Sequence, residues 1–343
     1  MGESGRVSGA ALLARLLADP AQAPGIDRRA WTGILAAARA EQLIGTLAWR
    51  LEGLPLPDRA CAILRDARDG AAQARQAALW EAEMARRALA GLAVPVVLLK
   101  GTAFVAAGLS AGVGRAIGDL DILVRRHDLP AVEAALLGAG WEWVKEDDYD
   151  DLYYRRWMHE LPPLIHRTRD RMIDVHHTIL PPTARPTPDA AALVDASIPL
   201  ENGLRILCPE DMVIHAAAHL LADGDLAGGL RNLWDIDRLL REFMAEPGFW
   251  ARLEERAGRH QLRAPLARAL RLTERLYATP VDADLAGPAR PADALYVRRL
   301  LARDGWGRGT RRATRLAFYV RSHWLRMPPA MLARHLWIKL RKG

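Results

Sequence analysis

The first 92 residues carry apolar side chains at helical spacing. Leucine and isoleucine recur three or four positions apart, as at Leu12, Leu16, Ile34, Leu43 and Leu47. This spacing places them on one face of a helix. After the turn sequence PLPDRA at 55–60, residues 58–91 contain no helix breaker stronger than Gly70. The pattern predicts a helical region over residues 1–92 that ends in one long helix.

Between residues 93 and 180 the apolar pattern changes to short strand-like runs. VPVVLL (94–99) and DLDILV (119–124) read as strands, and a helical stretch follows each of them, at 102–109 and 129–140. The later β-prone runs are WEWV (141–144), LYYRRW (152–157), PPLIH (162–166) and RMIDVHHTIL (171–180). Residues 93–180 are therefore predicted to form an α+β core, a sheet flanked by helices.

The segment PPTARPTPDA at 181–190 holds four prolines in ten residues, which predicts a linker or a long surface loop. Helical periodicity returns after it. The sequence thus predicts three parts: an N-terminal helical region (1–92), a catalytic core (93–180) and a C-terminal helical domain with a basic tail (181–343).

Length and composition narrow the class of protein. The chain has 343 residues, half of them hydrophobic, which is enough for two or three compact units. No stretch of 18 apolar residues occurs, and the first ten residues, MGESGRVSGA, lack the apolar core of a signal peptide. A cytoplasmic protein without a membrane span is expected. Cys61 and Cys208 lie far apart, so neither a disulfide framework nor a cysteine metal site is indicated.

The positive charge is concentrated at the C-terminus. From Arg308 onward there are ten Lys or Arg and no acidic residue, whereas the whole chain carries a net charge of +7. The aromatic residues between these charges are Phe318, Tyr319, Trp324 and Trp337. Such a tail can contact RNA, a peptide or a membrane surface. The interpretation we favour is a helix pair that packs its aromatics inward and leaves its arginines in solvent.

Two aspartates interrupt the apolar run at 119–124. Because side chains alternate along a strand, Asp119 and Asp121 point to the same face, about 7 Å apart. Two carboxylates so placed can bind one or two hard cations such as Mg²⁺. The run RMIDVHHT adds a third carboxylate, Asp174, with His176 on the same face. Lys100 ends the preceding strand and is followed by a helix, which places an ammonium and backbone N–H groups where a phosphate can bind.

These motifs together resemble the DNA polymerase β-like nucleotidyltransferase superfamily, and within it a group of uncharacterised bacterial nucleotidyltransferases. The motif line of that group is an apolar strand ending in K-G, then R-x-x-G-D-h-D-h-h-V, a helix closed by G-aromatic, and h-D-h-H. In this chain the corresponding residues are Lys100-Gly101, Arg115 to Val124, Gly140-Trp141 and Ile173 to His176. The resemblance covers roughly residues 93–180.

The resemblance implies a small mixed sheet and a Mg²⁺- or Mn²⁺-dependent transfer of NMP from an NTP, ATP by abundance, to a hydroxyl or phosphate, with release of pyrophosphate. Asp119 and Asp121 would hold the metals, and Asp174 would complete the metal site and help activate the acceptor. The residues expected to bind the nucleotide are Lys100, Gly101, Thr102, Arg115 and Gly118. Arg115 has an alternative interpretation, a salt bridge to the same aspartates.

The acceptor is not identified by the sequence, and a small molecule, a peptide and a protein all remain open. His176, His219, Arg231 and Asp235 are candidates to contact the base or the acceptor. Two rival functions are a non-catalytic nucleotide-binding or scaffold protein that uses the basic tail, and an enzyme that acts on RNA ends.

Several further motifs give weaker indications of a functional site. GVGRAIG at 112–118 precedes a strand instead of following one, so it is not a dinucleotide fingerprint. His215 and His219 have the i, i+4 spacing of zinc ligands, but Ala216 stands where H-E-x-x-H needs glutamate, which favours core or cleft histidines. Asp235 and Asp237 fall in a helix, where i and i+2 side chains diverge. His159 and His166 have no predicted role.

Overall fold

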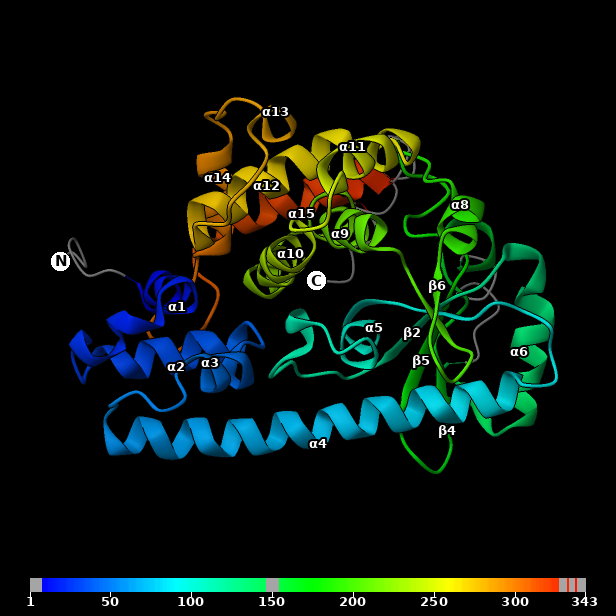
Figure 1. Cartoon of the computed structure of the whole chain (residues 1–343), viewed down its shortest axis with the longest axis horizontal. Coiled ribbons are helices and arrows are strands. Elements are labelled where there is room, and N and C mark those ends of the chain that lie inside the picture. The colour runs from blue at the N-terminus through cyan, green and yellow to red at the C-terminus, as the bar shows by residue number, and fades with distance from the viewer. Residues whose placement is uncertain (1–7, 146–153, 327–331, 333–336, 338–343) are drawn as a thin grey trace.

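A computed structural model of the chain describes residues 8–145, 154–326, 332 and 337. The long helix α4 (Asp58–Leu89) runs along one side of the molecule, from the N-terminal helices to the central sheet (Figure 1). Asp58 in its first turn and Arg86 and Arg87 in its last complement the helix dipole. The predicted long helix is confirmed, and it connects the two halves of the fold.

The N-terminal helices pack around a leucine- and alanine-rich core. Ser8 caps the first of them by accepting a hydrogen bond from the Ala11 amide. The elements are α1 (Gly9–Ala18), the 3₁₀ helix η1 (Pro20–Gly25), α2 (Ala30–Ala40) and α3 (Ile44–Arg50). The turn between α2 and α3 is held by the neighbouring helix α10 (Gly229–Phe243), because Arg231 donates to the Gln42 carbonyl at 2.7 Å.

Within the described residues, seven strands form one mixed sheet in the order β3-β4-β5-β2-β1-β7-β6. The central strand β2 pairs parallel with β5 and antiparallel with β1. In the β2–β5 register, Asp121 lies directly opposite Asp174. The strands are β1 (Val97–Leu98), β2 (Leu120–Leu123), β3 (Trp141–Trp143), β4 (Leu164–His166), β5 (Met172–His176), β6 (Ile198–Pro199) and β7 (Arg205–Ile206).

The sheet with its flanking helices confirms the predicted α+β class. Two of its strands, β6 and β7, come after residue 180, so the sheet also draws on the segment that follows the proline-rich loop. The short elements between the strands are α5 (Lys100–Ala106), the 3₁₀ helices η2 (Ser110–Gly112) and η3 (Arg126–Asp128), and α6 (Leu129–Gly138).

One strand prediction is wrong. LYYRRW at 152–157 was expected to be β-structure, but residues 154–157 are helical, and residues 152–153 lie outside the described part of the chain. Arg155 of this turn donates two hydrogen bonds to Glu133 of α6, at 2.6 and 2.8 Å, and lies over the Trp143 ring. These tertiary contacts outweigh the strand propensity of the aromatic residues.

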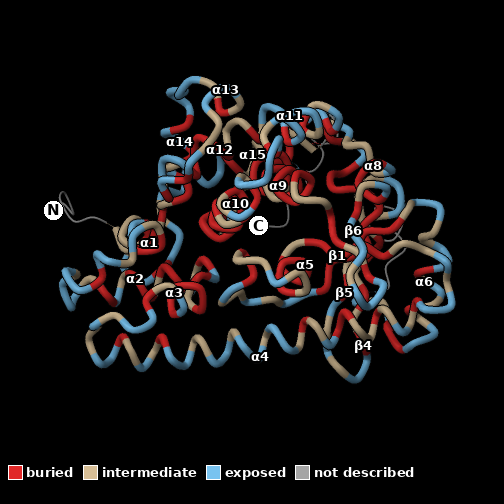
Figure 2. Tube along the Cα trace, in the orientation of Figure 1, coloured by how far each residue is buried: buried red, intermediate tan, exposed pale blue. Residues whose placement is uncertain are grey.

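The C-terminal helices lie beside the sheet in Figure 1, and α12 (Arg263–Tyr277) packs against α1 of the N-terminal helices. Figure 2 shows that α9 and α10 are buried along much of their length. Buried charges in this region are paired: Arg256 with Asp211, and Arg271 with Asp293. The helices are α8 (Ala190–Asp195), α9 (Pro209–Ala218), the π-helix η4 (His219–Asp223), α10 (Gly229–Phe243), α11 (Phe249–Arg259), α12 (Arg263–Tyr277), α13 (Ala283–Ala286), α14 (Asp293–Leu300) and α15 (Arg312–Arg326).

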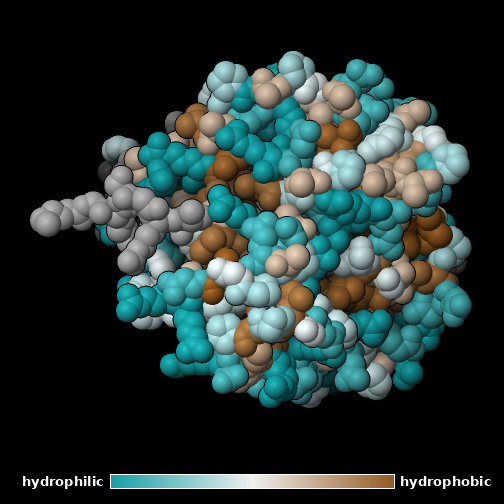
Figure 3. Space-filling view, turned by 60° about the vertical axis from the view of Figure 1, so that its left-hand side comes forward, coloured by the Kyte–Doolittle hydropathy of each residue, from teal (hydrophilic) through white to brown (hydrophobic). Residues whose placement is uncertain are grey.

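The described part of the basic tail forms α15, which packs against the other C-terminal helices. Its Phe318 is buried against the Tyr296 ring in a T-shaped contact. Trp324 stays 42% exposed, and the Arg185 guanidinium lies over its ring. Among the described helices, none has both the length and the apolar content needed to cross a membrane. On the face that carries the N-terminal helices, hydrophobic side chains lie in separate patches among hydrophilic ones (Figure 3).

The glycine-rich loop before β2 is fixed by a close backbone contact. Gly114 has a φ of +65°, and a Cβ on it would lie 2.5 Å from the Gly45 carbonyl of α3. Thr46 donates a hydrogen bond toward the same loop, 3.2 Å from the Val113 oxygen. Only glycine satisfies both the backbone angle and the contact. The loop that leads to Asp119 is thereby anchored to the N-terminal helices.

We predict that Gly114→Ala lowers the free energy of unfolding by about 2 kcal/mol, because it adds a clash with Gly45 and a disfavoured φ. Chemical denaturation measures the change. The matched control is Gly70→Ala, at an exposed position of α4 where a Cβ meets no atom within 4 Å; it should stabilise the helix slightly. Equal stability of the two variants would show that the contact is not constraining.

Candidate functional site

Three carboxylates converge where β2 begins beside β5. Asp119 directly precedes β2, Asp121 is its second residue, and Asp174 lies opposite Asp121 on β5. Each offers an oxygen within 4.8 Å of the others. Asp119 is exposed, Asp174 half-buried and Asp121 buried, so the group opens toward solvent at Asp119. The structure therefore brings together all three aspartates that the sequence singled out.

Asp121 receives two hydrogen bonds on one oxygen. Lys100 Nζ lies 2.5 Å from Oδ1, and His176 Nε2 lies 3.0 Å from the same atom. Burial opposes the charged carboxylate, but Lys100 and His176 stabilise it and hold the pKa of Asp121 well below its usual range. Within the described part of the chain, Oδ2 has no hydrogen-bond partner. It is the oxygen left for a cation.

Lys100 reaches Asp121 from an unusual backbone conformation. It has a φ of +49°, a left-handed angle that costs a non-glycine residue free energy. The conformation turns the chain from β1 into α5 directly beside β2, where the Leu99 amide donates to the Asp121 carbonyl at 3.0 Å. Burial disfavours the ammonium, yet the neighbouring Asp121 raises the pKa of Lys100, so this lysine is charged. The strained residue is thus the one that neutralises Asp121.

Asp174 lacks such compensation. Burial raises its pKa to about 7, and the charges of Asp121 and Glu160 raise it further toward that value. A carboxyl held half-protonated at neutral pH beside two other carboxylates fits a site for a divalent cation, because carboxylate oxygens are the preferred ligands of Mg²⁺. Asp119, Asp121 and Asp174 are the residues that would hold it.

Arg115 is anchored away from the carboxylates. It forms an ion pair with Asp235 of α10, which also lies 3.4 Å from Arg231 Nη1. The expected alternative, a salt bridge from Arg115 to Asp119 or Asp121, is therefore replaced by one to a more distant aspartate. A Cβ on Gly101 would lie 2.4 Å from Arg115 Nε, so the glycine is needed for the packing of this arginine.

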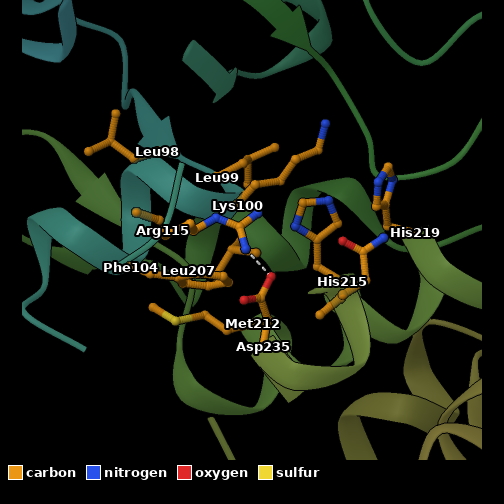
Figure 4. Close-up of a pocket in the computed structure, with 13 residues that line it drawn as sticks. Leu98, Leu99, Lys100, Phe104, Arg115, Leu207, Met212, His215, His219 and Asp235 are labelled. Atoms are coloured by element: carbon orange, nitrogen blue, oxygen red, sulfur yellow. Dashed lines mark hydrogen bonds and ion pairs between the residues drawn. The ribbon is translucent and has the colours of Figure 1, made fainter. Parts of the chain in front are cut away.

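A small cavity lies between the Lys100 turn and helices α9 and α10. Its volume is about 50 Å³. Figure 4 shows the Arg115–Asp235 pair on one side of it, and His215 and His219 on the other. Pockets that hold small ligands are typically about 300 Å³ or larger, so a nucleobase does not fit in this form. Burial and the nearby Lys100 lower the pKa of His215 well below its usual value, which keeps its ring neutral.

The other predicted residues take varied positions. Gly118 is exposed beside Asp119, and a Cβ there would meet no atom within 4 Å. Thr102 is buried in α5. Arg231 is buried at the contact between α10 and the N-terminal helices, where it donates to Thr46 Oγ1 at 2.6 Å. His219 and Asp235 line the small cavity. Their roles in binding a base or an acceptor stay predictions.

Glu160 is a residue near the carboxylates that no sequence motif indicates. The residue forms an isolated antiparallel bridge with His176, and its carboxylate lies 3.5 Å from His176 Nδ1. His159, for which no role was predicted, lies beside it, with a pKa lowered to about 2 by burial and by the charges of His176 and Lys100. His166 contacts the edge of Trp141 and accepts from the Thr168 amide, which is a structural role. No local pattern signals the Glu160 pairing.

The two aspartates of α10 diverge as helix geometry predicts. Asp235 faces Arg115, whereas Asp237 is bound by Arg241 and by the Thr279 hydroxyl at 2.7 Å. They cannot share a metal. Both serve to fix α10, one toward the cavity and one toward α12.

A mixed sheet that carries carboxylates on two adjacent strands is the arrangement expected of the nucleotidyltransferase superfamily. A family model described as "Uncharacterised nucleotidyltransferase" matches residues 27–278. The match spans most of the chain, including the sheet and helices α9 and α10, and the protein therefore belongs to this family of nucleotidyltransferases. A search of curated proteins gives no significant match.

We predict that Lys100→Met lowers the free energy of unfolding by about 2 kcal/mol without divalent cations, because Asp121 loses its buried counter-charge. Added Mg²⁺ should then raise the melting temperature of the variant more than that of the wild type, since the metal replaces the missing positive charge. Thermal unfolding with and without Mg²⁺ measures both effects.

The control for this variant is Arg125→Met, which breaks the exposed pair with Asp195 and should change stability by less than about 1 kcal/mol. An equal response of Lys100→Met and wild type to Mg²⁺ would contradict the idea that lysine and metal neutralise the same carboxylate group.

The raised pKa of Asp174, about 7, predicts a pH dependence of metal binding. Below pH 7 this carboxyl is mostly protonated, and a cation must displace the proton; above pH 7 it is already ionised. The apparent Mg²⁺ affinity should therefore rise from pH 6 to pH 8 and then level off. Calorimetry at pH 7 in buffers of different ionisation enthalpy should detect proton release on Mg²⁺ binding. An affinity that is constant over this range would contradict the prediction.

Proposed function

We propose that the protein transfers NMP from an NTP to a hydroxyl or phosphate group of an acceptor and releases pyrophosphate. The observation that carries the proposal is the cluster of Asp119, Asp121 and Asp174, whose oxygens lie within 4.8 Å of one another at the start of β2 and the middle of β5. Membership of the nucleotidyltransferase family supports it. Three carboxylates this close suit a cation-dependent reaction of a polyphosphate.

In the proposed reaction, the acceptor oxygen attacks the α-phosphorus, a new P–O bond forms and the bond to pyrophosphate breaks. Bound Mg²⁺ or Mn²⁺ would supply charge neutralisation for the triphosphate and lower the pKa of the acceptor. Asp119 and Asp121 would hold the metal ions. Asp174 would complete the site and, ionised by the bound cation, receive the acceptor proton as a general base.

Lys100 is the residue we assign to the phosphates. In the structure its ammonium neutralises Asp121, and its side chain is about a quarter exposed, so it lies at the boundary between the buried carboxylate and solvent. Once a metal neutralises Asp121, the ammonium is free to bind a phosphate oxygen. Gly118 leaves open space beside Asp119 for the substrate. Gly101, Thr102 and Arg115 act, in this proposal, by supporting the Lys100 turn.

The acceptor we propose is a small molecule, a peptide or a protein. ATP is the first nucleotide to test, because it is the most abundant. The exposed side of the carboxylate cluster, at Asp119, is where the triphosphate and the acceptor would meet.

Calorimetric titration of each NTP with Mg²⁺ tests nucleotide binding. We expect one nucleotide to bind the wild type only with Mg²⁺, and its affinity to fall at least about 100-fold in Asp119→Asn/Asp121→Asn, since the metal ligands are removed. Asp66→Asn, at an exposed position of α4, makes the same chemical change away from the site and should bind normally. Nucleotide binding that survives in the double variant would place the site elsewhere.

Transfer is tested with α-labelled nucleotide and a panel of acceptors, with pyrophosphate release as the second readout. Asp174→Asn should reduce turnover by about two orders of magnitude or more while leaving folding stability close to that of the wild type. Wild-type turnover in this variant would overturn the mechanism. Tight Mg²⁺-dependent nucleotide binding without pyrophosphate release across the panel would favour a non-catalytic nucleotide-binding protein.

A further inference from the structure

A second cluster of ligand-type side chains adjoins Asp121 through His176. His159, Glu160 and His176 each offer one nitrogen or oxygen atom within 4.8 Å of the others. Glu160 Oε2 lies 3.5 Å from His176 Nδ1 and 3.7 Å from His159 Nε2. The planes of the two imidazole rings are tilted by 33° to each other, and the ring centroids are 5.2 Å apart.

These distances are too long for good hydrogen bonds, which join nitrogen and oxygen at about 2.7–3.2 Å. Distances of 3.5 and 3.7 Å are instead close to the separation of two atoms that bind the same metal ion. With bonds of about 2.0–2.1 Å to nitrogen and oxygen, neighbouring ligands of a tetrahedral ion are roughly 3.4 Å apart. The spacing of the side chains therefore fits a shared metal ion better than direct hydrogen bonds between them.

His176 is oriented in the way that metal-binding histidines usually are. Such a histidine donates its second ring N–H to a carboxylate or carbonyl, and the remaining nitrogen is left as the ligand. Here Nε2 faces Asp121 Oδ1 at 3.0 Å, so Nδ1 points to Glu160. Because His176 is only 2% exposed, this orientation is fixed by packing.

His159 differs from His176, because its Nε2 faces Glu160 while its second ring nitrogen is unpaired within the described part of the chain. Its Nδ1 is buried and has no hydrogen-bond partner among the described residues, which leaves ring binding capacity unused in the interior. The main chain fixes its place, since the His177 amide donates to the His159 carbonyl at 2.9 Å. A cavity of about 160 Å³, lined in part by Glu160, Arg126 and Arg155, lies beside the cluster at Glu160.

We propose that His159, Glu160 and His176 form a second metal site, for Zn²⁺ or a related borderline cation. Two imidazoles and one carboxylate form the three-ligand set typical of zinc sites with an open position, whereas Mg²⁺ prefers oxygen ligands alone. The site is separate from the three aspartates but is joined to them, because His176 links the ion to Asp121. An ion here fixes the orientation of Asp121 and does not depend on the reaction assigned to the aspartates.

The experiment uses tag-free, metal-stripped full-length protein and no nucleotide. Co²⁺ is titrated first, because its visible absorption reports tetrahedral coordination by nitrogen and oxygen, and Zn²⁺ is then used to displace it in competition with a chromophoric chelator. We expect one equivalent of Co²⁺ to give a tetrahedral spectrum that Zn²⁺ removes, with an excess of Mg²⁺ present throughout to occupy the carboxylates.

Two ligand variants and two controls locate the ion. Glu160→Gln and His159→Gln should each weaken Zn²⁺ binding at least about 100-fold. His127→Gln, at an exposed histidine outside the cluster, and Asp119→Asn, in the carboxylate group, should retain wild-type Zn²⁺ affinity. Circular dichroism and thermal unfolding confirm that each variant is folded. If His159→Gln does not fold, the test rests on Glu160→Gln.

The proposal is overturned if the wild type binds no Zn²⁺ or Co²⁺ at micromolar concentration, or if folded Glu160→Gln keeps its Zn²⁺ affinity. Loss of Zn²⁺ binding in Asp119→Asn instead of Glu160→Gln would place the ion on the aspartates and also overturn it. These readouts are independent of nucleotide transfer, so an inactive enzyme with a normal Co²⁺ spectrum would contradict the proposed function and leave the second site established.

Discussion

The structure depends on the parallel pairing of β2 with β5, which sets Asp121 directly opposite Asp174. Two carboxylates on neighbouring strands, with Asp119 beside them, repel one another, and the repulsion grows as water is excluded. The protein compensates Asp121 with Lys100 and His176, whereas Asp174 is left with a pKa raised to about 7. The remaining imbalance favours a divalent cation at this site, which is the basis of the proposed function.

Much of the surrounding structure holds this arrangement in place. The Lys100 turn packs on Arg115, Arg115 pairs with Asp235 of α10, and α10 is tied to the N-terminal helices by Arg231. The loop before β2 is fixed a second time by the contact of Gly114 with α3. Segments more than 100 residues apart in the chain therefore meet around one short strand. A change at α3 or α10 is expected to affect the carboxylates without touching them.

The proposed cation sites differ in chemistry although one histidine connects them. Carboxylates alone face solvent at Asp119, which suits a hard ion that arrives with its substrate. Two imidazoles and Glu160 lie deeper, which suits an ion that stays bound. His176 contributes to both, since one nitrogen faces Asp121 and the other faces Glu160. An ion bound by His159, Glu160 and His176 would thus set the geometry of the three-aspartate site.

The sequence by itself determined the long helix α4 and the apolar strands, and it indicated that the three aspartates and Lys100 lie together. Periodicity and motif spacing suffice for this because they are local properties of the chain. It misjudged the aromatic run that ends in the helical turn at 154–157, where Arg155 binds Glu133 of α6. Only the tertiary structure decided the β2–β5 register, the partner of Arg115 and the position of Glu160 beside His176. Each of these depends on segments distant in sequence, whose relative placement is set by packing of the whole core and is not encoded in any local pattern.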